Sequence, residues 1–153
     1  MPEYLETVVD KFTFRVATDR LYHPEGIWVR PVPGGALPRI RIGVTDFLQQ
    51  HGGDVAFVSV KAVGTRLIEG EEVASLETIK VNLSLPAPVA GAVVEVNAAL
   101  EPTPEIVNQD PYGEGWLAVI DATAWETDRA RLLDPQAYFS VMRAQVEQEL
   151  KQS

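Results

Sequence analysis

The chain has 153 residues, of which 46% are hydrophobic and 23% are charged, a balance typical of folded globular proteins. Its 13 basic and 22 acidic residues give a net charge of −9, which repels phosphate backbones and makes nucleic acid a poor partner. No apolar run approaches the roughly 20 residues that cross a bilayer, so the sequence excludes a membrane-spanning helix and gives no reason to expect a membrane partner.

A chain of this length buries about 68–70% of the surface that its unfolded form exposes, so we expect one domain over residues 1–153. The first residues, 1–6, lack the basic region and apolar stretch of a signal peptide, which predicts a cytoplasmic protein. The acidity has two interpretations of equal weight. It favours docking to basic enzyme surfaces, or it only keeps the domain soluble.

The sequence contains no cysteine, which excludes disulfides, thiolate metal sites and a redox thiol of the protein's own. The two histidines, His23 and His51, have no acidic or histidine neighbour at metal-ligand spacing, so no metal site is expected. Any sulfur chemistry therefore has to come from an attached cofactor.

In chain order, residues 12–16 alternate apolar and polar side chains, which predicts a strand. Residues 30–39 hold three prolines and two glycines and predict a turn-rich loop. Short extended runs separated by turn signals then indicate an all-β sandwich or barrel, and they cover residues 40–44, 55–60, 66–68, 73–79, 81–85, 92–96 and 116–120.

Short helices are predicted between these strands. Thr45 can cap a helix that ends at Gly52 and Gly53. Thr103 followed by Pro104 predicts the start of another helical turn.

Two further helices are predicted near the end of the chain. Thr123 and Glu126 have the spacing of a capping box. Asp134 and Pro135 predict the start of the last helix, whose apolar stripe should pack on the sheet and consists of Tyr138, Met142, Val146 and Leu150.

Lys80 lies between the two extended runs 73–79 and 81–85. An antiparallel hairpin centred between Lys80 and Val81 would pair Leu76 with Leu85 and place the lysine amine at the tip, in solvent. Taken alone, Lys80 is most simply an ordinary charged turn residue. Its surroundings favour a more specific interpretation.

Residues 110–116 are rich in glycine but do not form a phosphate loop, because no Lys-Ser or Lys-Thr pair follows them. We expect a tight turn in which Gly113 and Gly115 take positive φ angles, with Tyr112 and Trp116 packing over the sheet. No catalytic triad is evident, so the sequence does not predict a self-contained enzyme.

Four segments together resemble the H-protein of the glycine cleavage system: Glu77-Thr78-Ile79-Lys80, and the runs at 42–47, 87–97 and 107–116. The similarity extends from about Tyr22 to Tyr138. It implies a mainly β fold, the lipoyl-type barrel-sandwich hybrid of two antiparallel sheets with short helices and a C-terminal helix. Residues 1–20 are then an N-terminal extension, and residues 123–151 are a C-terminal helical segment.

The resemblance further implies a carrier rather than an enzyme, with lipoate covalently attached to Lys80. Biotin-carrying domains flank their lysine with methionines, whereas here the neighbours are Ile79 and Val81. Glu77 matches a family position implicated in recognition by the lipoylating enzyme. The alternative is that Glu77 is simply a solvent-exposed charged residue on a strand.

Two acidic positions of the family pattern are not acidic in this chain. Glycine-cleavage H-proteins generally have His-Glu-Trp where this chain has Gly26-Ile27-Trp28, and many have an acidic residue where this chain has Ser84. The resemblance implies that Ile27, Trp28 and Ser84 line the cleft that shelters the loaded arm. An aminomethyl cargo has an ammonium group, and a cleft without carboxylates is a poor host for it.

On this basis the sequence favours a carrier of sulfur intermediates in cytoplasmic sulfur oxidation, similar to the lipoate-binding proteins that work with a heterodisulfide-reductase-like complex. The alternative is a true H-protein that carries the aminomethyl group between the decarboxylase, the aminomethyltransferase and the lipoamide dehydrogenase, which are the P-, T- and L-proteins. A third possibility is a regulatory or lipoyl-relay protein that is not itself lipoylated.

Overall fold

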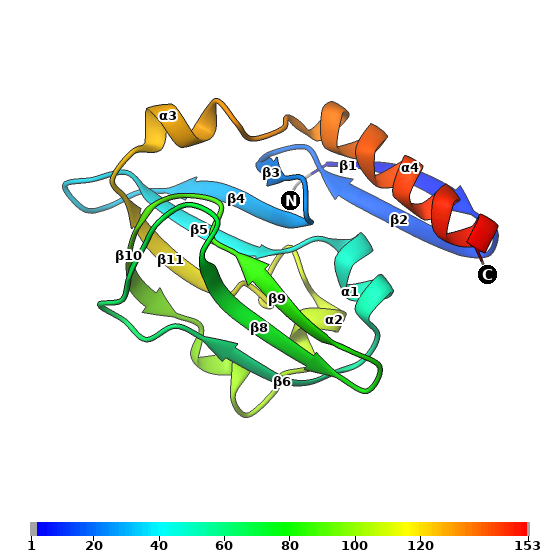
Figure 1. The fold of residues 1–153 in the computed structure, drawn as a ribbon, viewed down its shortest axis with the longest axis horizontal. Coiled ribbons are helices and arrows are strands. Elements are labelled where there is room, and N and C mark those ends of the chain that lie inside the picture. Colours follow the sequence, from blue (N-terminus) through cyan, green and yellow to red (C-terminus); the bar gives the residue numbers. More distant parts are fainter. Residues whose placement is uncertain (1–2, 153) are drawn as a thin grey trace.

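The structure, a computed structural model, describes residues 3–152. Met1, Pro2 and Ser153, the ends of the single predicted domain, lie outside the described residues. Two antiparallel sheets face one another, and a separate hairpin lies beside them under the last helix (Figure 1). The larger sheet has the order β3 (Leu21–His23), β4 (Ile27–Val32), β5 (Arg39–Val44), β11 (Ala118–Ala122), β10 (Gly91–Val96) and β7 (Arg66–Leu67).

The smaller sheet has the order β6 (Val55–Val60), β8 (Glu72–Thr78) and β9 (Asn82–Pro86). The hairpin consists of β1 (Tyr4–Val9) and β2 (Phe12–Ala17). Every pairing in these sheets is antiparallel, which confirms the mainly β fold of two facing sheets.

The helical elements are α1 (Asp46–Gly52), the 3-10 turn η1 (Ala98–Leu100), α2 (Ile106–Gln109), α3 (Trp125–Arg129) and α4 (Pro135–Gln152). The Thr45 cap is confirmed, since its hydroxyl accepts a hydrogen bond from the Leu48 amide. The start of α4 is also confirmed, because Asp134 Oδ1 accepts from the Ala137 amide at 2.8 Å.

Two predicted caps are wrong. The helical turn α2 starts after Glu105 without a side-chain cap, and Thr103 contributes only its backbone carbonyl, which accepts from the Ile106 amide. The capping box at Thr123 is absent, because Ala124 is the residue that precedes α3 and it forms no side-chain cap.

The strand predictions are also corrected. The residue pattern did not indicate β1, β3 or β4, and the loop expected over 30–39 is shorter because β4 continues to Val32. Gly113 and Gly115 do not have positive φ angles. Gly115 is required by close approach instead, since a Cβ there would lie 2.6 Å from the Ile106 carbonyl oxygen.

Buried side chains form two clusters. The main cluster fills the space between the two sheets and includes Ile27, Ile42 and Leu76. The second lies between the β1–β2 hairpin, α1 and α4, and includes Tyr22 and Tyr138, whose rings stack at 4.6 Å. Met142 and Val146 of the predicted α4 stripe are buried there, whereas Leu150 is 38% exposed.

Across residues 3–152, no helix is long and apolar enough to cross a membrane. The same residues contain no group of three or more His, Asp or Glu side chains that could hold a metal ion.

Candidate functional site

The turn between β8 and β9 is tied together by the side chain of Thr78. Its hydroxyl accepts hydrogen bonds from the amides of Lys80 (3.1 Å) and Val81 (2.9 Å), and it donates to the Val81 carbonyl at 2.9 Å. The Thr78 amide also donates to that carbonyl. Because threonine can replace missing backbone partners in this way, a short turn needs no glycine at its tip.

The register of this hairpin differs from the prediction. Glu77 pairs with Asn82 and Leu76 with Leu83, rather than Leu76 with Leu85. The centre therefore lies between Ile79 and Lys80. The hairpin is thus shifted by one residue from its predicted centre, because the Thr78 hydroxyl and amide fix a four-residue turn from Thr78 to Val81.

Lys80 lies at the tip of this hairpin and is exposed, as predicted. No ion pair joins its amine to any described residue. Its stem crosses Gly53 at the end of α1, where a Cβ added to the glycine would lie 3.6 Å from Lys80 Cδ. The neighbouring turn is held in place by the Ile79 amide, which donates to the Asp54 carbonyl at 3.2 Å.

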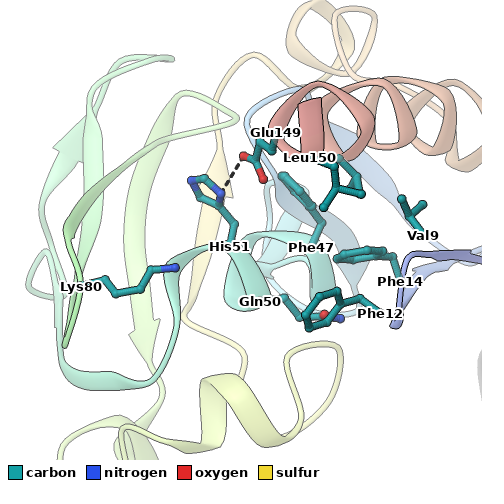
Figure 2. A pocket seen from close by; sticks show the side chains of 10 residues that line it. Val9, Phe12, Phe14, Phe47, Gln50, His51, Lys80, Glu149 and Leu150 are labelled. Carbon is teal, nitrogen blue, oxygen red and sulfur yellow. Dashed lines mark ion pairs between the residues drawn. The ribbon is translucent and has the colours of Figure 1, made fainter. Parts of the chain in front are cut away.

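A groove of about 290 Å³ begins at Lys80 and runs between α1, the β1–β2 hairpin and α4. Figure 2 shows the Lys80 side chain extended toward α1, with His51 and Phe47 beyond it. His51 Nδ1 lies 2.7 Å from Glu149 Oε1, and the His51 ring stacks on Phe47 at 5.7 Å. The groove thus combines an apolar interior with one histidine–carboxylate contact.

The comparisons agree on one family. The family model described as "Glycine cleavage H-protein" matches residues 20–145. A glycine cleavage system H protein of Thermus thermophilus is 41% identical over 130 residues, which are 85% of this chain and 98% of that protein. The chain belongs to the glycine cleavage H-protein family.

Further similarities concern the same family. The glycine cleavage system H protein of Coprothermobacter proteolyticus is 46% identical over 100 residues, covering 65% of this chain and 76% of that protein. The crystal structure of a glycine cleavage system H protein from Mycobacterium marinum superposes with a TM-score of 0.71 at 34% identity, covering 80% of this chain and 95% of the other.

Membership of the H-protein family makes the chain a lipoyl carrier, not an enzyme, and makes lipoate its cofactor. The comparisons lend no support to the sulfur-oxidation interpretation or to a heterodisulfide-reductase-like partner. They support the alternative, with the P-, T- and L-proteins as partners.

The residues present fit a lipoyl group. An amide-linked arm requires an exposed lysine on a rigid support, and the four lysines are Lys11, Lys61, Lys80 and Lys151. Lys61 pairs with Glu72 at 3.5 Å, and Lys11 and Lys151 lie outside the matched region of the H-protein family. Lys80 alone combines the family match, a tied hairpin tip and an adjoining groove.

The structure does not bring the predicted cleft residues together. Ile27 is fully buried in the main cluster between the sheets, and Trp28 points to the other face of β4 into the second cluster. Ser84 is exposed on β9, where its hydroxyl donates to Glu72 Oε1 at 2.7 Å. None of the three is among the described residues that line the groove beside Lys80.

Trp28 and Glu77 have distinct surroundings. The indole of Trp28 donates to the Pro111 carbonyl at 2.9 Å, and its ring requires glycine at position 43, where a Cβ would lie 2.5 Å from the ring. Glu77 is exposed at the end of β8, one residue before the turn. Its position is compatible with recognition by a lipoylating enzyme, which stays a prediction.

Sequence reasoning missed Thr78 and Glu149. A threonine two residues before an exposed lysine is a signal for a side-chain-closed turn, and it was readable in the sequence. Glu149 had no such signal, because only the packing of α4 on the hairpin places it beside His51.

Proposed function

We propose that this chain is the lipoyl carrier of a glycine cleavage system, with lipoate amide-linked to Lys80. The observation that carries the proposal is the position of Lys80 at the tip of a tied hairpin, inside the segment that matches the H-protein family. When bound, lipoate supplies the dithiolane sulfur that a chain without cysteine lacks. Its clients are the decarboxylase, the aminomethyltransferase and the lipoamide dehydrogenase.

The chain's own residues provide a fixed anchor and a charged surface. Thr78 holds the backbone of the anchor, so that motion is confined to the side chain and the arm. The net charge of −9 becomes −10 when acylation removes the positive charge of Lys80 (−9 − 1 = −10). This field favours encounter with basic surfaces on the client enzymes at low salt.

The assignment of Lys80 is tested by intact-mass measurement after expression in a lipoylating host. Wild type should gain the mass of one lipoyl group, and Lys80→Arg should lose it. Lys11→Arg is the matched control, because Lys11 also lies in a hairpin turn, between β1 and β2. An adduct that survives Lys80→Arg, or the absence of any adduct on wild type, would refute the anchor.

A second candidate, the carriage of sulfur intermediates on the same arm, is favoured by one observation. The chain has Ile27 and Ser84 where the resemblance to H-proteins implies two carboxylates. Glycine–bicarbonate exchange with the decarboxylase separates the two functions. Robust exchange supports aminomethyl transfer, whereas a lipoylated chain that gives no exchange supports sulfur carriage. The cytoplasmic location predicted from the sequence fits either function.

A further inference from the structure

The last residues of α2 hold the loop between α1 and β6. Asn108 Oδ1 accepts a hydrogen bond from the Val55 amide at 2.9 Å, and Asn108 Nδ2 donates to the Gly53 carbonyl at 3.0 Å. α2 also packs directly against α1 (Figure 1). Because Gly53 and Val55 flank Asp54, a single side chain fixes this three-residue loop at both of its ends.

This loop contacts the base of the arm in two ways. The Asp54 carbonyl accepts a hydrogen bond from the Ile79 amide at 3.2 Å. The Lys80 stem lies against Gly53, where an added Cβ would be 3.6 Å from Lys80 Cδ. The hydrogen bonds therefore run from Asn108 to the loop and from the loop to the hairpin tip, so Asn108 acts on Lys80 through the loop.

Asn108 is itself fixed to the core. Its neighbour Val107 is fully buried in the main cluster between the sheets. The Asn108 amide donates to the Glu105 carbonyl at 3.0 Å, which closes the helical turn. The side chain thus projects from a packed element, and the loop that it holds is attached to the core rather than to solvent-exposed chain.

The partners of this side chain require an asparagine. In addition to the two loop contacts, Nδ2 donates to Gln49 Oε1 on α1 at 3.1 Å, while Gln49 Nε2 donates to Asp46 Oδ1 at 2.9 Å. Asn108 thus faces one N–H donor and two acceptor oxygens. A carboxamide matches this set with one acceptor oxygen and two N–H donors, whereas an ionised carboxylate has acceptors only.

We propose that Asn108 is a positioning residue for the lipoylation of Lys80. Thr78 closes the hairpin turn from within, but a closed turn is still free to move as a unit relative to the sheets. Asn108 removes that freedom, because it fixes the loop to which the Ile79 amide is bonded. The lipoylating enzyme then meets a tip that is already ordered, and no binding free energy is lost in ordering it. This role rests on the proposed function, since it needs an arm at position 80.

The first experiment measures kcat and KM of a lipoylating ligase, supplied with lipoate and ATP, for the unmodified full-length chain. Asn108→Asp keeps the shape and the acceptor oxygen of the side chain but removes both donors. We expect its KM to rise roughly fivefold, the scale of one hydrogen bond, at unchanged kcat, because only the ordering of the tip before binding is affected. A KM equal to that of wild type would overturn the positioning role.

Asn97→Asp is the matched control, because Asn97 has the same set of partners in another loop. Its Nδ2 donates to the carbonyls of Glu114 and Trp116 at 2.7 and 2.8 Å, and its Oδ1 accepts from the Ala99 amide at 3.0 Å. Asn97 is buried and Asn108 only partly buried, so the control should lower the thermal unfolding temperature at least as much. Its KM should stay at the wild-type value. An equal rise of KM in both variants would assign the effect to general stability and overturn the proposal.

The second experiment does not depend on lipoylation. Hydrogen exchange of the Ile79 amide, followed by NMR on the unmodified chain, reports whether its bond to the Asp54 carbonyl is kept. Exchange should be roughly fivefold faster in Asn108→Asp and unchanged in Asn97→Asp. A wild-type exchange rate in Asn108→Asp would overturn the link between Asn108 and the tip. A wild-type chain that gains no lipoyl adduct would defeat the proposed function instead, and the exchange of Ile79 would still decide whether Asn108 holds the tip.

Discussion

Thr78 shows how one side chain fixes the geometry on which the function depends. It is nearly buried, and its hydroxyl holds the two amides that follow the tip of the hairpin as well as one carbonyl. Lys80 and Val81 are therefore held by a group that belongs to neither residue. The exposed lysine is positioned by its neighbour rather than by contacts of its own.

Replacement of Thr78 by valine should remove these three hydrogen bonds at nearly constant volume. Each is worth about 0.5–1.5 kcal/mol, and the stranded amides add to the loss, so we expect destabilisation of about 2 kcal/mol and slower lipoylation of Lys80. Urea denaturation and the time course of the intact mass measure the two effects. Thr78→Ser keeps the hydroxyl and should retain most of both. A valine variant as stable as wild type would show that the turn does not need Thr78.

Ile27 offers a second test at this scale. Its side chain is fully buried between the sheets, so Ile27→Glu should not restore a cleft carboxylate but should place an unpaired charge in the core, at a cost of about 3–5 kcal/mol. Thermal unfolding measures the loss. Ile27→Val, which removes one methylene, should cost only about 0.5–1.5 kcal/mol. A glutamate variant with wild-type stability and faster exchange with the decarboxylase would show that position 27 faces a cleft after all.

The β1–β2 hairpin, α1 and α4 form a unit of their own beside the two sheets. They share the second buried cluster, and Thr45 links two of them, because its hydroxyl caps α1 and lies 3.0 Å from the hydroxyl of Tyr138 on α4. The orientation of α4, and with it the position of Glu149, depends on this buried contact.

Thr45→Ala should remove the cap and leave the Tyr138 hydroxyl without a partner. The two losses together predict destabilisation of about 2 kcal/mol, measured by chemical denaturation. Thr45→Ser keeps both interactions and loses only one buried methyl group, so it should cost only about 1 kcal/mol. Should alanine be tolerated as well as serine, the link between α1 and α4 would lie elsewhere in the cluster.

The whole molecule encloses three tyrosines whose protonation is coupled to folding. Burial raises the pKa of the Tyr138 phenol to about 12, and burial likewise raises the pKa of Tyr22 and of Tyr112 above the ordinary value of 10.0. Because the unfolded chain loses these protons at lower pH than the folded chain, their contribution to stability is complete below pH 10 and is lost as the pH rises toward the folded pKa values.

The free energy of unfolding should therefore fall steadily above pH 10, where urea denaturation at several pH values can follow it. Tyr138→Phe removes one of the three ionisations and should make this fall shallower, although it lowers stability at neutral pH. A free energy of unfolding that stays constant from pH 9 to pH 12 would contradict the coupling.

The sequence was most informative where residue patterns have a local physical cause. Short extended runs bounded by turn signals predicted most of the strands, and Thr45 and Asp134 predicted two helix starts. Prediction from the sequence failed where an element depends on tertiary contacts or where a turn lacks its usual residues. Strand β1 and its pairing with β2 went unnoticed because the turn between them uses Asp10, with φ 58°, and Lys11 in place of a glycine.

The site followed the same division. The exposed position of Lys80 at a hairpin tip was predicted from its neighbours in the sequence, but the centre of the hairpin was placed one residue too far along the chain, because the closing role of Thr78 is a side-chain effect. Nothing local predicts that residues near the start and the end of the chain, such as Phe12 and Glu149, converge on the same groove.

The crossing of the Lys80 stem over Gly53, with the Ile79 amide bound to the Asp54 carbonyl, makes the base of the arm a fixed pivot. Because its base is fixed, the far end of the tether stays within one limiting distance of Lys80. Each client enzyme must bring its catalytic pocket within that distance. A single tether can enter only one catalytic pocket at a time, so the client enzymes must receive it in turn.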